Sequence, residues 1–150
     1  MTIRVQTEDF DASQELNSMR LSEQSVGAVV SFIGQVRDLN DGDEIQTLTL
    51  EHYPGMTEKA LEAIENEAKA RWSVLESCII HRVGTLKPQD QIVLVAVSSA
   101  HRGDAFKACE FIMDFLKTQA PFWKKEVTNK GERWVEAKLS DEVAQSKWNK

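Results

Sequence analysis

Runs of apolar and β-branched residues mark short strands along the chain. They predict strands over Thr2–Gln6, Ala28–Ile33, Gln46–Glu51, Cys78–Val83 and Ile92–Ser98. After Pro121 the pattern has a period of two, which places Phe122, Lys124 and Glu126 on one face of a further strand. A turn at Asn129–Gly131 then predicts a hairpin that continues toward Trp134.

Apolar residues spaced three and four positions apart predict a long helix between Asp104 and Ala120. Its apolar stripe consists of Ala105, Ala108, Cys109, Ile112, Met113 and Leu116. Asp104 lies in the first turn or at the N-cap, where a carboxylate suits the free N–H groups and the helix dipole. Pro121 prevents the helix from continuing. Lys117 therefore lies in its last turn.

Two shorter helices are also expected, together with a polar segment at the end of the chain. The first helix covers Ala12–Leu21, and the second follows Pro54-Gly55 with Thr57 as its N-cap. The second continues at helical spacing to Trp72. Residues from about 138 to 150 predict a polar C-terminal helix or tail.

The order of these elements predicts an α+β fold with helices packed on a mostly antiparallel sheet. A ferredoxin-like split βαβ arrangement is the nearest generic alternative. Pro88 and Asp90 predict a hairpin turn between the fourth and fifth strands, and Asp38–Glu44 predicts a flexible loop. With 150 residues, of which 41% are hydrophobic, the chain can form one well-packed core. We expect a single domain over residues 1–150.

The formal net charge of −6 argues against general binding to nucleic acid or membranes, which needs a basic surface. The N-terminal segment has no apolar signal region, and the longest aliphatic run, Ile92–Val97, is too short to span a membrane. We therefore expect a cytoplasmic protein.

Cys78 and Cys109 lack metal-binding or CxxC spacing, so we expect both to be reduced packing residues. The three histidines are scattered and predict no metal site, and His52 and His81 are expected to be structural.

Cationic side chains gather at both ends of the long helix in this otherwise acidic chain. His101 and Arg102 precede the helix, Lys117 lies near its end, and Lys124 and Lys125 follow it. Such groups, if they converge, form a pocket for an anion. Taken singly, each is more commonly a solvated charge or, for His101, a capping residue. The pattern alone therefore predicts an acidic α+β domain with a possible anion site.

Several longer strings of residues say more than the periodicity does. They are GQVRD at Gly34–Asp38, LTLEHYPGMTEKAL at Leu48–Leu61, RVG at Arg82–Gly84, SSAHRGDAF at Ser98–Phe106, FIMDFLKTQAPFWKKE at Phe111–Glu126 and RWVEA at Arg133–Ala137. In this order and spacing they resemble the large, catalytic subunit of molybdopterin synthase, the MoaE family. The resemblance extends from about Val26 to Ala137. One departure is Gln35, where members of the family often carry lysine.

The resemblance implies an α/β hammerhead fold and a sulfurtransferase activity. The family converts a cyclic pyranopterin monophosphate into molybdopterin by installing two sulfurs as a dithiolene, a step in molybdenum cofactor biosynthesis. The sulfur arrives as a thiocarboxylate on the C-terminal Gly-Gly of a small ubiquitin-like subunit. No cysteine of this chain and no cofactor is therefore required. Members of the family form a central homodimer with a small subunit at each end, which makes a heterotetramer.

The resemblance also implies a set of site residues. The substrate site comprises Gln35, Val36, Arg37, His101, Arg102, Lys117, Lys124, Lys125 and Glu126. Lys117 and Lys124 are the expected catalytic residues, because an ammonium group can hold an anion and also move a proton. Arginine suits phosphate through its planar fork of donors, and histidine suits it as a donor or an acid.

Two other classes of function remain open from the residues alone. One is a non-catalytic receptor for a ubiquitin-like tail, in which the basic groups only hold a carboxylate. The other is a phosphometabolite-binding regulatory domain of ferredoxin-like form, in which Lys117 and Lys124 are ordinary anion contacts.

Bulky aromatic residues bear on the oligomeric state. The four tryptophans are Trp72, Trp123, Trp134 and Trp148, and six phenylalanines accompany them. These are many bulky groups for one core, which favours a homodimer with aromatics at its interface. The alternative is that all of them pack inside one protomer.

Overall fold

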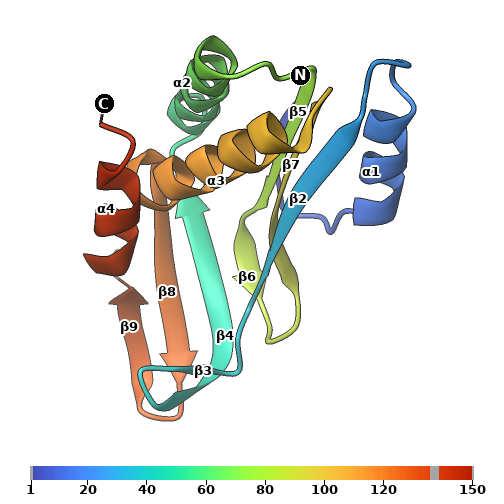
Figure 1. The fold of residues 1–150 in the computed structure, drawn as a ribbon. Helices are drawn as coiled ribbons and strands as arrows, with labels where there is room; N and C mark the ends of the chain where they lie inside the picture. Colours follow the sequence, from blue (N-terminus) through green and yellow to red (C-terminus); the bar gives the residue numbers. More distant parts are fainter. Residues whose placement is uncertain (1, 136–138, 150) are drawn as a thin grey trace.

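The computed structural model describes residues 2–135 and 139–149, which form two sheets with helices packed around them (Figure 1). In chain order the elements are β1 (Thr2–Gln6), α1 (Ala12–Arg20), β2 (Ala28–Gln35), β3 (Leu39–Asn40), β4 (Asp43–His52), α2 (Met56–Arg71), β5 (Glu76–Arg82), β6 (Gly84–Leu86), β7 (Gln91–Ser99), α3 (Arg102–Gln119), β8 (Phe122–Thr128), β9 (Gly131–Val135) and α4 (Leu139–Ser146). Residues 136–138, which include the end of the RWVEA string, lie outside the described part.

The first sheet has four strands in the order β1-β5-β7-β2, so β2 forms one of its edges. β1 is parallel to β5, and the other two pairs in this sheet are antiparallel. The alternation of β7 divides its side chains between two apolar layers. Val93, Val95 and Val97 pack in the layer with α2 and α3, whereas Leu94 and Ala96 pack in the layer with α1.

The second sheet has the order β3-β4-β8-β9, with β6 also paired to β4, and its described pairs are antiparallel. A third apolar cluster, which includes Leu48, Leu50, Val83 and Leu86, packs against this sheet. The prediction of an α+β fold with a mostly antiparallel sheet is confirmed. A ferredoxin-like fold has a single sheet, so the second sheet distinguishes this structure from that alternative.

Helix α3 lies where its sequence pattern predicts. All six residues of the predicted stripe are buried, and Phe111 is buried with them. The ring of Phe111 meets Trp72 and Trp148 edge-on, with centroids 5.4 and 5.6 Å apart. These two tryptophans therefore pack inside the protomer, whereas Trp123 and Trp134 are 48% and 57% exposed.

The C-terminal segment forms a helix, α4, over part of its predicted range. It packs on α3, where Thr118 Oγ1 donates to Gln145 Oε1 (2.8 Å). Just beyond α4, Trp148 Nε1 donates to Asp114 Oδ2 (2.7 Å). α4 thereby covers one side of the C-terminal half of α3.

The start of α2 differs from its prediction, because Gly55 rather than Thr57 is the N-cap. Gly55 has φ +86°, a conformation that is strained for any residue with a Cβ. Its N–H donates to Glu58 Oε2 (2.8 Å). The Thr57 hydroxyl turns back instead: it accepts from the Tyr53 N–H (3.1 Å) and donates to the Tyr53 carbonyl (2.9 Å).

The segment Asp38–Glu44, expected as a flexible loop, is mostly a tight hairpin between β3 and β4. Asp41 and Gly42 form its turn, with φ +52° and +81°. An Asp-Gly pair with positive φ at both positions is the preferred two-residue hairpin turn.

The predicted turn before β7 is present, with the Asp90 N–H bonded to the Lys87 carbonyl (3.0 Å). The short strand β6, which sequence reasoning missed, precedes that turn.

The two cysteines are buried and free, as expected of packing residues. Across residues 2–135 and 139–149, no helix has the length and apolar character needed to cross a membrane.

Candidate active site

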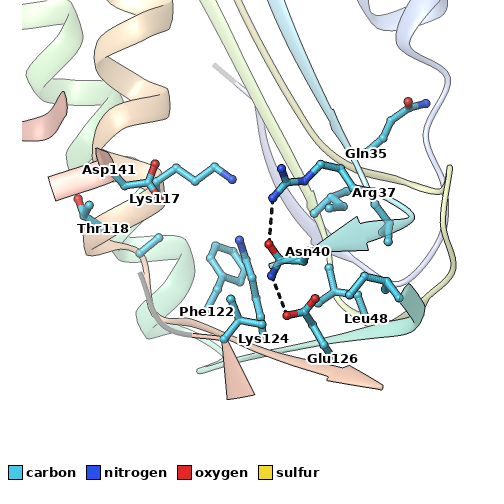
Figure 2. Close-up of a pocket in the computed structure, with 15 residues that line it drawn as sticks. Gln35, Arg37, Asn40, Leu48, Lys117, Thr118, Phe122, Lys124, Glu126 and Asp141 are labelled. Carbon is cyan, nitrogen blue, oxygen red and sulfur yellow. Dashed lines mark hydrogen bonds between the residues drawn. The ribbon is translucent and has the colours of Figure 1, made fainter. Parts of the chain in front are cut away.

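A pocket of about 370 Å³ lies where the C-terminal end of α3 meets β8, β4 and the segment after β2 (Figure 2). Its polar lining consists of Gln35, Arg37, Asn40, Lys117, Thr118, Lys124, Glu126 and Asp141. Its apolar lining includes Ile45, Leu48, Ile92 and Phe122. The volume is in the usual range for a small-molecule site.

Three cationic side chains enter this pocket from different elements. Lys117 comes from the last turn of α3, Lys124 from the third position of β8, and Arg37 from just beyond β2. Pro121 ends the helix and the chain reverses into β8, so the two lysines point into the same space (Figure 2). Arg37 points toward them from the opposite side of the pocket (Figure 2). The convergence of Lys117 and Lys124 that the residue pattern predicts is therefore present in the structure, and Arg37, which the resemblance adds, lines the same pocket.

The alternation of β8 decides which of its residues reach the pocket. Phe122, Lys124 and Glu126 line it, as the period of two predicts. Lys125 lies on the other face of the sheet, where its ammonium is 3.8 Å from Glu132 Oε2 and 5.8 Å from the centre of the Trp134 ring. The structure therefore does not bring Lys125 into the pocket.

Glu126 is only 4% exposed and anchors a polar network at one wall. Its Oε1 accepts from Asn40 Nδ2 (2.9 Å) and from Arg133 Nε (3.4 Å). Asn40 Oδ1 in turn accepts from Arg37 Nη2 (3.4 Å), as Figure 2 shows. Behind this wall, Arg133 Nη1 donates to Asp43 Oδ2 (2.6 Å). Hydrogen bonds from Lys130 and Arg133 hold the pKa of Asp43 below its usual range.

His81 lies against Phe122, which belongs to the apolar lining that forms the floor of the pocket. Its ring stacks on Phe122, with centroids 3.8 Å apart and planes 15° apart. Its Nδ1 is 2.8 Å from the Arg82 carbonyl, and because a carbonyl only accepts, Nδ1 carries the proton. Burial lowers the pKa of His81 to about 3, and the charges of Lys124 and Lys117 act in the same direction. His81 is thus a neutral packing residue, as its sequence context predicts.

His101 and Arg102 do not reach this pocket within one chain. His101 is the N-cap of α3 and Arg102 is its first residue, and both are exposed. At 1.5 Å of rise per residue, about 22 Å along the helix separates Arg102 from Lys117. Gln35 and Val36 do line the pocket, but the Gln35 side chain points away from the cationic cluster (Figure 2).

Asn40 is the main pocket residue that sequence reasoning missed. The signal was present in the Asp41-Gly42 pair, which marks a hairpin and so places Asn40 on a short strand instead of in a loop. Among residues 2–135 and 139–149, no group of three or more His, Cys, Asp or Glu side chains is arranged to hold a metal ion.

Comparison with known proteins identifies the family. The model of the MoaE protein family matches residues 5–119. The chain belongs to the MoaE family. Within it, the molybdopterin synthase catalytic subunit of Haemophilus influenzae is 61% identical, over 97% of this chain and 97% of its own length. The family expected from the resemblance is therefore confirmed.

Solved structures place the fold in the same family. The molybdopterin biosynthesis MoaE protein from Burkholderia ambifaria superimposes with a TM-score of 0.85 and 53% identity, over 99% of this chain and 98% of its own. A complex of subunits 1 and 2 of molybdopterin-converting factor from Helicobacter pylori has a TM-score of 0.74 over 89% of this chain and 90% of its own. At 20% identity, that second match supports the fold alone.

Proposed function

We propose that this chain is the catalytic subunit of a molybdopterin synthase. It transfers sulfur from the C-terminal thiocarboxylate of a small ubiquitin-like subunit to cyclic pyranopterin monophosphate and so builds the dithiolene of molybdopterin. The observation that carries the proposal is the convergence of Lys117, Lys124 and Arg37 in one pocket of a MoaE-family chain. The Haemophilus influenzae relative, named as a catalytic subunit, supports the activity.

The charges of the pocket suit this reaction. Both reactants present an anion, a phosphate on the pterin and a thiocarboxylate on the partner. Three cations in a pocket with an apolar floor attract such groups, and partial exclusion of water strengthens each contact. The local cluster does this although the whole chain carries a net charge of −6.

The residues have separate roles in this proposal. Arg37 binds the phosphate through its guanidinium fork. Lys117 and Lys124 hold the thiocarboxylate and the reacting oxygens, and they move protons as the cyclic phosphate opens and as sulfur replaces oxygen. Phe122, backed by the neutral ring of His81, gives the pterin an apolar surface. Glu126 acts by holding the wall of the pocket.

The assembly we propose is a homodimer with one small subunit bound to each chain. β2 is an edge strand, and Phe32 and Ile33 on it are 41% and 40% exposed. A two-fold pairing of two β2 edges would run antiparallel, so the start of one β2 would lie beside the end of the other. His101 and Arg102 lie near the start of β2, because Ala28 pairs with Ser99, whereas Arg37 follows its end. In such a dimer, His101 and Arg102 of one copy complete the phosphate site of the other.

Reconstitution with purified components tests the activity. The chain, the thiocarboxylated small subunit and cyclic pyranopterin monophosphate are mixed, and formation of the dithiolene product is followed. We expect turnover with the wild-type chain and its near-abolition in Lys117→Ala and in Lys124→Ala. Both variants should keep the wild-type unfolding midpoint, because half-exposed or exposed side chains contribute little to stability.

The matched control is Lys107→Ala, which removes an exposed lysine from the same helix away from the pocket. It should turn over at the wild-type rate. Normal turnover in Lys117→Ala and Lys124→Ala would overturn the catalytic roles, and no dithiolene from the wild-type chain would overturn the proposed function.

A further inference from the structure

We propose that Asn40 is a positioning residue that fixes the guanidinium of Arg37 for the substrate phosphate. Glu126 in turn sets the direction of the Asn40 side-chain amide. This inference rests on the proposed function, since it assigns Arg37 to the phosphate. Asn40 belongs to the short strand β3, and its side chain lies between Arg37 and Glu126 (Figure 2).

The direction of the Asn40 amide follows from its neighbours. Glu126 Oε1 is a buried acceptor that already receives Arg133 Nε at 3.4 Å. The group of Asn40 that faces it, 2.9 Å away, must donate and is therefore the amide nitrogen. The amide oxygen then faces the opposite way, where Arg37 Nη2 donates to it at 3.4 Å.

The backbone of Asn40 is anchored by the same arginine that holds Glu126. Arg133 Nη2 donates to the Asn40 carbonyl (2.9 Å), and Arg133 Nη1 donates to Asp43 Oδ2 (2.6 Å) across the hairpin. Lys130 Nζ lies 3.0 Å from the other oxygen of Asp43. Asn40 is thus held at both its backbone and its side chain, which gives the contact to Arg37 a fixed base.

A neutral amide suits this task better than a carboxylate. Arg37 is exposed, and an unrestrained arginine loses much rotamer freedom when it binds a ligand. A hydrogen bond from the Asn40 oxygen restrains the guanidinium before the ligand arrives. Because the amide carries no charge, the positive charge of Arg37 remains available for the phosphate. A carboxylate in its place would compete with the phosphate and would also face the carboxylate of Glu126.

The test is a double-mutant cycle on the full chain. Cyclic pyranopterin monophosphate is titrated by calorimetry into the wild type, Asn40→Ala, Arg37→Ala and the double variant. We expect Arg37→Ala to weaken affinity about ten- to a hundredfold and Asn40→Ala about five- to tenfold. The double variant should bind no more weakly than Arg37→Ala, because Asn40 acts through Arg37. In steady-state assays, Asn40→Ala should raise KM for the pterin with little change in kcat.

Two further variants sharpen the test. Asn40→Asp keeps an acceptor for Arg37 but adds charge, and it should bind at least as weakly as Asn40→Ala. Asn17→Ala removes an exposed amide side chain from α1 and should leave affinity unchanged. Asn40→Asp also serves if Asn40→Ala proves too unstable to assay.

The outcomes separate this inference from the proposed function. Unchanged affinity in Arg37→Ala would overturn the phosphate site and the inference with it. A loss in Arg37→Ala, combined with normal affinity in Asn40→Ala, would overturn the role of Asn40 alone. The same follows if the two losses multiply in the double variant, or if Asn40→Asp binds more tightly than the wild type.

Discussion

At the scale of single residues, Glu65 is a buried carboxyl group in α2 whose protonation bears on stability. It has no exposed surface, and Ser77 Oγ donates to its Oε2 at 2.6 Å. Burial raises its pKa to about 7, although the bond from Ser77 and the charge of Lys69 act in the opposite direction. The fold therefore favours the protonated form. Its stabilising contribution is complete below about pH 4.5 and is lost as the pH rises toward 7.

Replacing Glu65 with glutamine, which does not ionise, should remove the loss of stability that the ionisation of Glu65 causes as the pH rises. At pH 8 we expect Glu65→Gln to raise the free energy of unfolding by up to about 3 kcal/mol, and at pH 4.5 to change it little. Urea unfolding of the variant and the wild type at both pH values gives the difference in their free energies of unfolding. Groups that titrate alike in both proteins cancel in this difference. Glu62→Gln, an exposed position on the same helix, is the control and should show no such dependence. A pH-independent effect of Glu65→Gln would show that Glu65 does not titrate in this range.

Residue-level predictions from the sequence succeeded where one element sets the geometry. The placement of Lys117 and Lys124 follows from a helix that stops at Pro121 and a strand with a period of two. That period also puts Glu126 on the face of Lys124, whereas its assignment to the site came from the resemblance. The same period places Lys125 on the opposite face, so its inclusion in the cationic cluster was wrong: the structure does not bring it into the pocket. The Asp41-Gly42 pair could have placed Asn40 on a strand, but its contact with Glu126 could not be predicted from one element, because the two residues lie 86 positions apart in the sequence.

At the scale of elements, the hairpin between β3 and β4 supports one wall of the pocket. Gly42 has φ +81°, and a Cβ added there would meet no atom within 4 Å. The cost of a side chain is therefore conformational and not steric. The hairpin was missed because polar residues suggested a loop, although Asp41-Gly42 is a strong local signal for this turn.

Gly42→Ala should lower the free energy of unfolding by about 1 kcal/mol and weaken binding of the pterin severalfold, because Asn40 lies beside the turn. Urea unfolding and calorimetric titration measure the two effects. For stability the control is Gly103→Ala, since Gly103 is helical and has open space around it. That change should stabilise the protein by about 0.5–1 kcal/mol. Equal stability of Gly42→Ala and the wild type would mean that the turn tolerates a side chain.

At the scale of the whole molecule, the length of α3 sets what one chain can do. The helix is predictable from its stripe, and its rise of 1.5 Å per residue already separates Arg102 from Lys117 by about 22 Å. The sequence therefore contained the information that one chain cannot bring these residues together. It did not contain the position of β2 at a sheet edge, because strand order depends on pairings between distant segments. In the proposed homodimer, a second copy of the chain would bring its Arg102 to the pocket.

Mixing two inactive variants tests whether Arg102 acts across the proposed dimer. Arg102→Ala and Lys117→Ala are each expected to lose most activity alone. In a mixed dimer with sites shared between chains, the pocket of the Arg102→Ala chain keeps its own Lys117 and receives the intact Arg102 of the other copy. Random exchange of subunits should then restore about a quarter of the wild-type sites. If each site is built from one chain, no pocket in the mixture is intact, and activity stays at the level of the separate variants. Light scattering on the mixture establishes whether dimers are present. If the mixture is dimeric and activity does not recover, the shared site is overturned. A monomer at micromolar concentration would overturn the assembly itself.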